Sequence, residues 1–228
     1  MIVWAFRKRQ GIYHEQLRAF SCSGRARYFE GQLQMQADSD TEYTVVMDAA
    51  AMQATIRSMA LAIAADNPEL DSLALLGILR RGKPLADRLA ALIGEFTGHR
   101  PPVGVLSTTM YRDDLRAGSG DVMARMGETH FDFPIDNRTV LLVDDVLAAG
   151  RTIRAAMDEV MDYGRPERIQ LACLVDRGGR ELPIQADYLG YALGTVPGEW
   201  VFVRLQEIDG EDVVLVKSAA EPPEPEGE

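Results

Sequence analysis

Two adjacent carboxylates followed by a loop of small residues form the clearest candidate site for chemistry in this sequence. Asp144 and Asp145 follow the apolar run Val140–Val143, and positions 147 to 152 read Leu-Ala-Ala-Gly-Arg-Thr. Carboxylates accept hydrogen bonds from sugar hydroxyls, and loop amides at a helix N-terminus bind phosphate. The spacing predicts a site for a phosphorylated sugar; the alternative is an ordinary buried strand that ends in an acidic turn.

The segments around this site predict a strand before it and a helix after it. The run Val140–Val143 is typical of a central parallel strand that is buried on both faces. We expect this strand to end at Asp144, because acids cannot continue a buried run without unpaired charge. Apolar periodicity from Ile153 to Tyr163 predicts a helix that ends at Gly164. Open α/β sheets bind their ligands at the carboxyl ends of such strands.

The same alternation of strand and helix recurs along the chain and predicts an α/β fold, a central parallel sheet flanked by helices. Asp48 is a candidate N-cap for the first helix, which we expect to extend through Ala65. Asp209-Gly210 is a turn dipeptide and predicts a final hairpin. Further strands are expected at Tyr43–Met47, Leu73–Leu79, Val103–Thr109, Ile169–Val175, Trp200–Leu205 and Val213–Lys217, with a second helix that ends near Glu95.

Arginines beside glycine at strand ends predict anion contacts. Arg80 and Arg81 precede Gly82, where guanidinium groups would bind pyrophosphate oxygens bidentately. The segment 110–138 is long for a connection, which favours an active-site cover, and Arg112 would reach the leaving phosphate from it. The alternative for each arginine is an ordinary solvated side chain.

Length and composition limit the domain organisation. The 228 residues, 46% of them apolar, suit one core. We expect a flexible extension at 1–40, one domain at 41–218 and a disordered acidic tail at 219–228. We expect no membrane segment and a cytoplasmic location, with no disulfide between the two cysteines. The net charge of -11 argues against a surface generally coated by nucleic acid, and the three histidines lack the spacing of metal ligands.

The stretch Val140–Thr152 resembles the PRPP-binding motif of the type I phosphoribosyltransferases. Together with Tyr111–Leu115, Leu174–Gly178 and Arg180–Ile184, it is similar to the family of bifunctional pyrimidine operon attenuators and uracil phosphoribosyltransferases. The similarity extends from about Tyr43 to Val216. It implies the type I phosphoribosyltransferase fold, with a small hood that receives the base.

The resemblance also implies a reaction, in which uracil and PRPP give UMP and pyrophosphate. Substrate-bridged Mg²⁺ would be the cofactor, and we expect a homo-oligomer, for which the apolar helix residues Met52, Met59 and Ile63 could pair. The implied residues are Asp144, Asp145 and Arg112 for catalysis; Arg80, Arg81, Asp144, Asp145, Leu147, Ala148, Ala149, Gly150, Arg151 and Thr152 for PRPP; and Val175, Asp176 and Arg177 for uracil.

Several positions depart from the family pattern, so alternatives stay open. Ala149, Arg80, Ser107 and Gly179 replace, in that order, a hydroxyl residue, a threonine, an acid and a histidine that the family often carries, which bears on catalytic efficiency and base choice. The first helix has few basic residues, which argues against RNA as a partner. The alternatives are a UMP-sensing RNA-binding attenuator, a nucleotide sensor with weak or lost catalysis, and a phosphoribosyltransferase for another base such as orotate.

Overall fold

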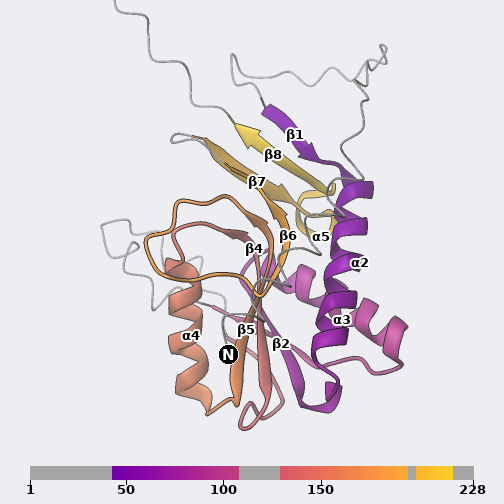
Figure 1. The fold of residues 1–228 in the computed structure, drawn as a ribbon, viewed down its shortest axis with the longest axis vertical. Helices are drawn as coiled ribbons and strands as arrows, with labels where there is room; N and C mark the ends of the chain where they lie inside the picture. Colours follow the sequence, from indigo (N-terminus) through magenta and orange to yellow (C-terminus); the bar gives the residue numbers. More distant parts are fainter. Residues whose placement is uncertain (1–42, 108–128, 195–198, 218–228) are drawn as a thin grey trace, which may run out of the picture. The chain divides into compact units, whose positions relative to one another are not determined.

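Two β-sheets organise the described part of the chain, residues 43–107, 129–194 and 199–217 of a computed structural model (Figure 1). Internal contacts divide the chain into Met1–Ser39 and Asp40–Glu228, and every described residue lies in the second unit. The predicted extension and tail therefore lie outside the described residues. The elements are β1 Tyr43–Met47, α2 Ala49–Asp66, β2 Leu73–Ile78, α3 Gly82–Thr97, β3 Val103–Leu106, β4 Thr139–Leu147, α4 Arg151–Tyr163, β5 Arg168–Asp176, β6 Tyr188–Ala192, β7 Trp200–Arg204, α5 Gln206–Asp209 and β8 Val213–Lys217.

The larger sheet is parallel and has β4 at its centre, in the order β3-β2-β4-β5-β6. Figure 1 shows α4 on one side of this sheet and α2 with α3 on the other. Alternate β4 residues serve the two layers: Leu141 and Val143 pack toward α2 and α3, whereas Leu142 packs with Ile153 and Val160 of α4. The predicted parallel sheet between helices is confirmed.

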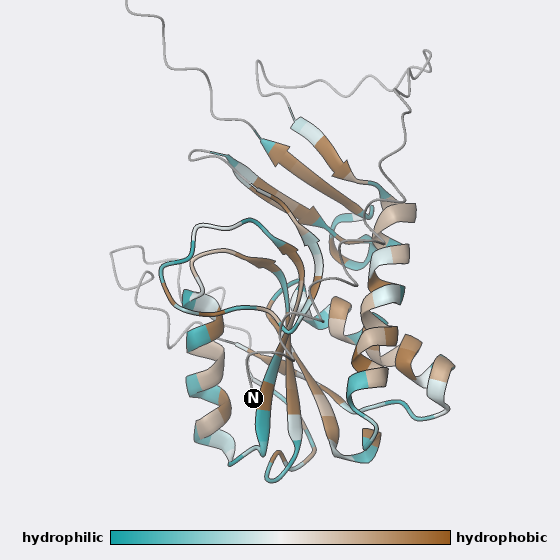
Figure 2. Ribbon diagram, in the orientation of Figure 1, coloured by the Kyte–Doolittle hydropathy of each residue, from teal (hydrophilic) through white to brown (hydrophobic). Residues whose placement is uncertain are grey.

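Apolar residues fill both layers because each strand of a covered parallel sheet is buried on both faces. Figure 2 shows brown segments along these strands, and α4 alternates between brown and teal. The core face of α2 carries Met52, Met59 and Ile63, all of them buried. This finding corrects our expectation that these side chains pair subunits, because the sheet of the same chain already covers them.

The smaller sheet is antiparallel, with the order β1-β8-β7, and we call it, together with α5, the hood. Its inner face joins the main core through Val203 and Val214. The predicted hairpin is confirmed, but α5 lies between its strands in place of a two-residue turn. Gly210 ends α5 with a φ of 79°, a conformation that favours glycine.

Two elements differ from the prediction at the edge where the site lies. Strand β4 continues through the acid pair to Leu147, because its backbone stays paired with β5 after the buried run, with Val146 opposite Val175. Asp144 can lie inside the strand since its Oδ1 accepts a hydrogen bond from the N–H of Asp145 at 3.0 Å. Strand β6 was not predicted; Tyr188 is buried, the following residues are half-buried or exposed, and the strand carries no strong alternation.

Other boundaries agree closely with the sequence. The Asp48 side chain caps α2 by accepting a hydrogen bond from the N–H of Ala51 at 2.8 Å, as predicted. Helix α4 ends at Gly164, also as predicted. Among the helices of the described ranges, none combines the length and apolar composition that crossing a bilayer requires.

Candidate functional site

The acid pair lies at the carboxyl end of the central strand. Asp144 is buried, and Asp145 is half-buried beside it. Burial raises the pKa of Asp145, and the hydrogen bond with Asp144 and the positive charge of Arg81 oppose that rise. Two carboxylates next to a cationic side chain suit a ligand that carries both hydroxyls and negative charge.

The chain turns directly from β4 into α4, through the loop Leu147–Gly150. Gly150 has a φ of 91°, and a Cβ added there would lie 3.4 Å from Ile184. Within the described residues, no side chain caps the N-terminus of α4. The partial positive charge of this helix end therefore faces the region after the acid pair and favours a phosphate there.

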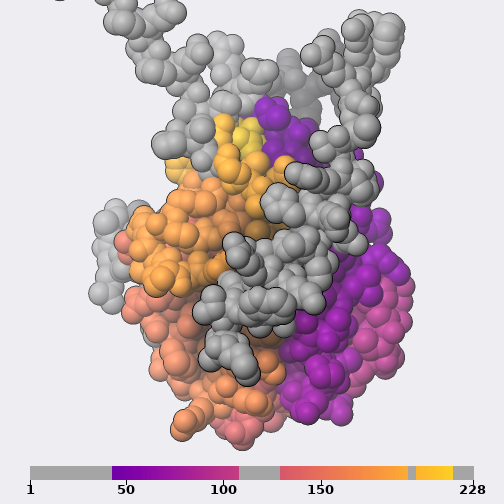
Figure 3. Space-filling view, in the orientation of Figure 1, coloured from indigo at the N-terminus to yellow at the C-terminus, as the bar shows by residue number. Residues whose placement is uncertain are grey.

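The connection between β5 and β6, residues 177–187, is bound to the same loop. The N–H of Arg177 donates to Leu147 O at 3.0 Å, and the N–H groups of Glu181 and Leu182 donate to Ala149 O at 3.0 and 3.1 Å. Figure 3 shows atoms of this region (orange) at the surface beside those of α4 (salmon). The residues predicted for base binding therefore lie beside those predicted for phosphate binding.

The predicted base-site residues lie at the end of β5. Val175 is fully buried, and the Asp176 side chain is 22% exposed. Both carboxylate oxygens of Asp176 have partners, since Oδ1 accepts from Gly178 N–H at 2.9 Å and Oδ2 forms an ion pair with Arg180 at 2.5 Å. Asp176 is thus held in one orientation.

The pyrophosphate turn predicted at Arg80 and Arg81 joins β2 to α3. Arg80 is exposed, whereas Arg81 forms an ion pair with Asp209 of the hood, with Nη2 to Oδ1 at 2.9 Å and Nε to Oδ2 at 3.2 Å. The turn reaches the acid pair because Gly82 packs directly on β4. A Cβ at Gly82 would lie 2.2 Å from Val143 O.

Arg112, predicted to reach the leaving phosphate, lies outside the described residues. The segment that we expected to cover the site is described only from Thr129 onward, where it is packed against the protein. His130 forms an antiparallel bridge with Val105, and Phe131 contacts the buried residues below α4.

A buried acid that the sequence did not single out fixes the start of this segment. Glu159 of α4 is 5% exposed and accepts a hydrogen bond from the Thr129 hydroxyl, which in turn accepts from the N–H of Ser107 at 2.8 Å. Burial raises the pKa of Glu159. The signal in the sequence was an acid on the apolar side of a strongly amphipathic helix.

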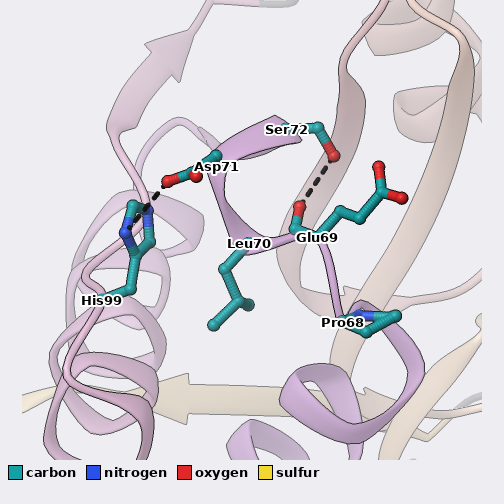
Figure 4. A pocket seen from close by; sticks show the side chains of 6 residues that line it. All are labelled: Pro68, Glu69, Leu70, Asp71, Ser72 and His99. Atoms are coloured by element: carbon teal, nitrogen blue, oxygen red, sulfur yellow. Dashed lines mark hydrogen bonds and ion pairs between the residues drawn. The ribbon is translucent and has the colours of Figure 1, made fainter.

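A surface hollow of about 510 Å³ lies at the opposite end of β2, where the strand begins. It is lined by Pro68–Ser72 and His99, and His99 pairs with Asp71 at 3.2 Å (Figure 4). No residue predicted for chemistry lines it. It is therefore separate from the candidate site.

The model of the phosphoribosyl transferase domain matches residues 43–206. The chain belongs to the phosphoribosyltransferase family. Within this family it is 46% identical over 180 residues to the Bifunctional protein PyrR of Pelotomaculum thermopropionicum, covering 79% of this chain and 98% of that protein. The Bifunctional protein PyrR of Thermus aquaticus is 48% identical over 169 residues, covering 74% and 92%. The resemblance inferred from the sequence is confirmed.

Solved structures of phosphoribosyltransferases share the fold. The hypoxanthine phosphoribosyltransferase of Trypanosoma cruzi superposes with a TM-score of 0.58 at 18% identity, covering 77% of this chain and 97% of that one. An HGPRT-ase of Leishmania tarentolae in complex with GMP gives 0.56 at 19% identity, covering 76% and 96%. At these identities the likeness establishes the type I phosphoribosyltransferase fold, which we had predicted.

Proposed function

We propose that this phosphoribosyltransferase transfers the phosphoribosyl group of PRPP to uracil, giving UMP and pyrophosphate. One observation carries the proposal: the acid pair, the uncapped N-terminus of α4 and the β5–β6 connection meet at one edge of the sheet. The binding sites for the sugar, the phosphate and the base would then be adjacent. The 46% identity to a protein called Bifunctional protein PyrR supports a pyrimidine base.

The residues of the site would act mainly by positioning. Cleavage at C1 of the ribose passes through an oxocarbenium-like state while negative charge grows on the leaving pyrophosphate. Asp144 and Asp145 would hold the ribose hydroxyls, the loop Leu147–Thr152 the 5-phosphate, and Arg81 with Arg112 the pyrophosphate. Holding two substrates in reactive contact supplies much of the rate acceleration, so the reaction requires little proton transfer by side chains.

The donor set fits a magnesium ion that arrives with the substrate. Among the described residues, no three acidic, histidine or cysteine side chains cluster as a metal cage. Mg²⁺ commonly keeps several waters and binds through one or two carboxylates plus substrate phosphates. Asp144 and Asp145 would supply the carboxylates, and the ion would neutralise charge on the leaving group.

Uracil would bind against Val175, Asp176 and Arg177 at the end of β5. The fixed Asp176 carboxylate keeps lone pairs for an N–H of the base, while backbone groups next to it offer donors and acceptors. Arg80 and Gly179 border these sites, so the departures noted in the sequence bear on rate and base choice.

A base panel tests the proposal. Purified protein at micromolar concentration is incubated with labelled PRPP, Mg²⁺ and uracil, orotate or hypoxanthine. We expect UMP with uracil and at least tenfold slower turnover with the other bases. Turnover with orotate alone would make it an orotate enzyme. Tight UMP binding without turnover would favour a nucleotide sensor.

The relatives' name includes the word bifunctional, which favours a regulatory role as a second function. The described surface of α2 offers little positive charge for RNA, because Arg57 stacks on Phe96 at 4.6 Å and pairs with Glu95 at 3.4 Å. Filter binding to pyrimidine-operon leader RNA, with and without UMP, tests this role. Cytoplasmic location and self-association stay predictions, to be checked by fractionation and by light scattering.

A further inference from the structure

Arg180 directs its whole guanidinium group into the protein. Its Nε donates to Ile184 O at 2.8 Å, its Nη1 to Ala148 O at 2.8 Å and to Leu147 O at 3.4 Å, and its Nη2 to Asp176 at 2.5 Å. The side chain is 24% exposed. One planar group thus joins three segments: the loop after β4, the end of β5 and the β5–β6 connection.

These contacts orient the peptide groups of the phosphate loop. Arg180 and the neighbouring N–H groups of residues 177, 181 and 182 hold the carbonyl oxygens of Leu147, Ala148 and Ala149. In a trans peptide the carbonyl and the following N–H point in opposite directions. The N–H groups of residues 148, 149 and 150 must therefore point away from Arg180, as donors to a phosphate on the opposite side of the loop would.

The same guanidinium fixes the base site. It pairs with Asp176 Oδ2, while Gly178 N–H holds Oδ1, so the carboxylate cannot rotate without breaking one of these contacts. A lysine would keep the charge at this position but could not reproduce a fork that reaches three carbonyls and a carboxylate together.

We propose that Arg180 is a positioning residue that holds the 5-phosphate loop and the base-binding Asp176 at a fixed spacing. This role rests on the proposed function, since it assigns the two sites that Arg180 joins. Arg180 acts through the protein and touches neither substrate. Its loss would move both binding sites at once.

Three variants test this role: Arg180→Ala, Arg180→Lys, and Arg154→Ala as a matched control. Arg154 lies on α4, and its side chain is 54% exposed and pairs with a neighbour on the same helix, Asp158, at 3.0 Å. Because displacement of reacting groups by about 1 Å costs roughly 100-fold, we expect kcat/KM to fall about 100-fold in Arg180→Ala. Arg180→Lys should fall at least tenfold, and Arg154→Ala should stay within twofold of the wild type.

Two readouts separate positioning from a general loss of structure. Millimolar guanidinium ion should raise the kcat/KM of Arg180→Ala at least fivefold. It should leave the kcat/KM of Arg180→Lys unchanged, because the lysine side chain fills the space. Calorimetry with ribose 5-phosphate and with UMP should show both affinities falling together. Circular dichroism monitors folding; should Arg180→Ala unfold, Arg180→Lys carries the test.

Two results would overturn the proposal. One is a kcat/KM for Arg180→Lys within threefold of the wild-type value. The other is a variant that loses affinity for UMP while its affinity for ribose 5-phosphate is unchanged. The failure of the proposed function looks different. In that case the wild type itself turns over none of the bases, and the Arg180 proposal is then judged on the calorimetry alone.

Discussion

The ion pair between Arg81 and Asp209 predicts that a hood residue limits the affinity of the site for pyrophosphate. Arg81, in the pyrophosphate turn, is also the arginine whose positive charge opposes the rise that burial causes in the pKa of Asp145. Its Nε and Nη2 donate to the two oxygens of Asp209. An anion that binds Arg81 must therefore share the guanidinium with a carboxylate, and Asp209→Asn removes this competing charge.

The size of the effect follows from distance and exposure. A phosphate oxygen at the opposite edge of the guanidinium would lie roughly 7 Å from Asp209, where two unit charges repel by about 0.6 kcal/mol in water. Two charges on the ligand double this repulsion and salt reduces it, so Asp209→Asn should bind pyrophosphate about 1 kcal/mol more tightly, or roughly fivefold. Because the paired side chains are 33% and 21% exposed, solvent screens the pair, and we expect the unfolding free energy to fall by only about 1 kcal/mol.

The pH range for the experiment follows from the pKa of Asp209. Burial alone would raise this pKa, but hydrogen bonds from Arg81 and from the N–H of Leu205 outweigh burial and lower it. The folded protein therefore favours the charged form, and the stability that the pair contributes is present at neutral pH and lost as the pH falls into the acid range. Measurements at pH 7.5 capture the full effect.

Isothermal titration with magnesium pyrophosphate measures the affinity, and urea denaturation measures the stability. Glu211→Gln is the matched control, since Glu211 lies in the same connection and its carboxylate pairs with Arg204 of β7. A pyrophosphate affinity that decreases in Asp209→Asn, with Glu211→Gln unchanged, would refute the reasoning. Such a result would mean that Asp209 orients Arg81 for the anion and does not compete with it.

Three further substitutions probe the frame of the site. Gly82→Ala places a Cβ 2.2 Å from Val143 O. We therefore expect the unfolding free energy to fall by at least about 3 kcal/mol. A variant as stable as the wild type in urea titration would contradict the close packing of the turn on β4. Gly150→Ala forces an alanine to adopt a φ of 91°, which should cost about 1–2 kcal/mol of unfolding free energy. The variant should bind ribose 5-phosphate more weakly in calorimetry. An unchanged affinity would argue against this loop as the phosphate site. The raised pKa of Glu159 means that the folded state favours the protonated carboxyl, so its stabilising contribution is present in acid and falls as the pH rises above the ordinary value of 4.5. Glu159→Gln should therefore gain stability relative to the wild type as the pH rises above 4.5; parallel pH profiles of the two proteins would contradict this.

Local sequence was sufficient to predict the central strand and the loop that follows it. Four apolar residues ahead of two acids and a run of small residues have few conformational solutions, because each preference is set within a few positions. The same is true of the Asp48 cap and of the end of α4 at Gly164. These features depend on the backbone and on near neighbours, and the structure placed them as expected, except that β4 continues past Asp144 to Leu147.

The partners of the charged side chains were decided only by the tertiary structure. Arg81 meets Asp209 across 128 positions, and Arg180 reaches carbonyls of a loop more than 30 positions earlier. Whether an arginine faces solvent, substrate or a distant carboxylate depends on which segments the sheet brings together, and local sequence does not encode that juxtaposition. The continuation of β4 through its acids has the same origin, since its pairing with β5 offers the backbone hydrogen bonds that the local charge pattern argued against.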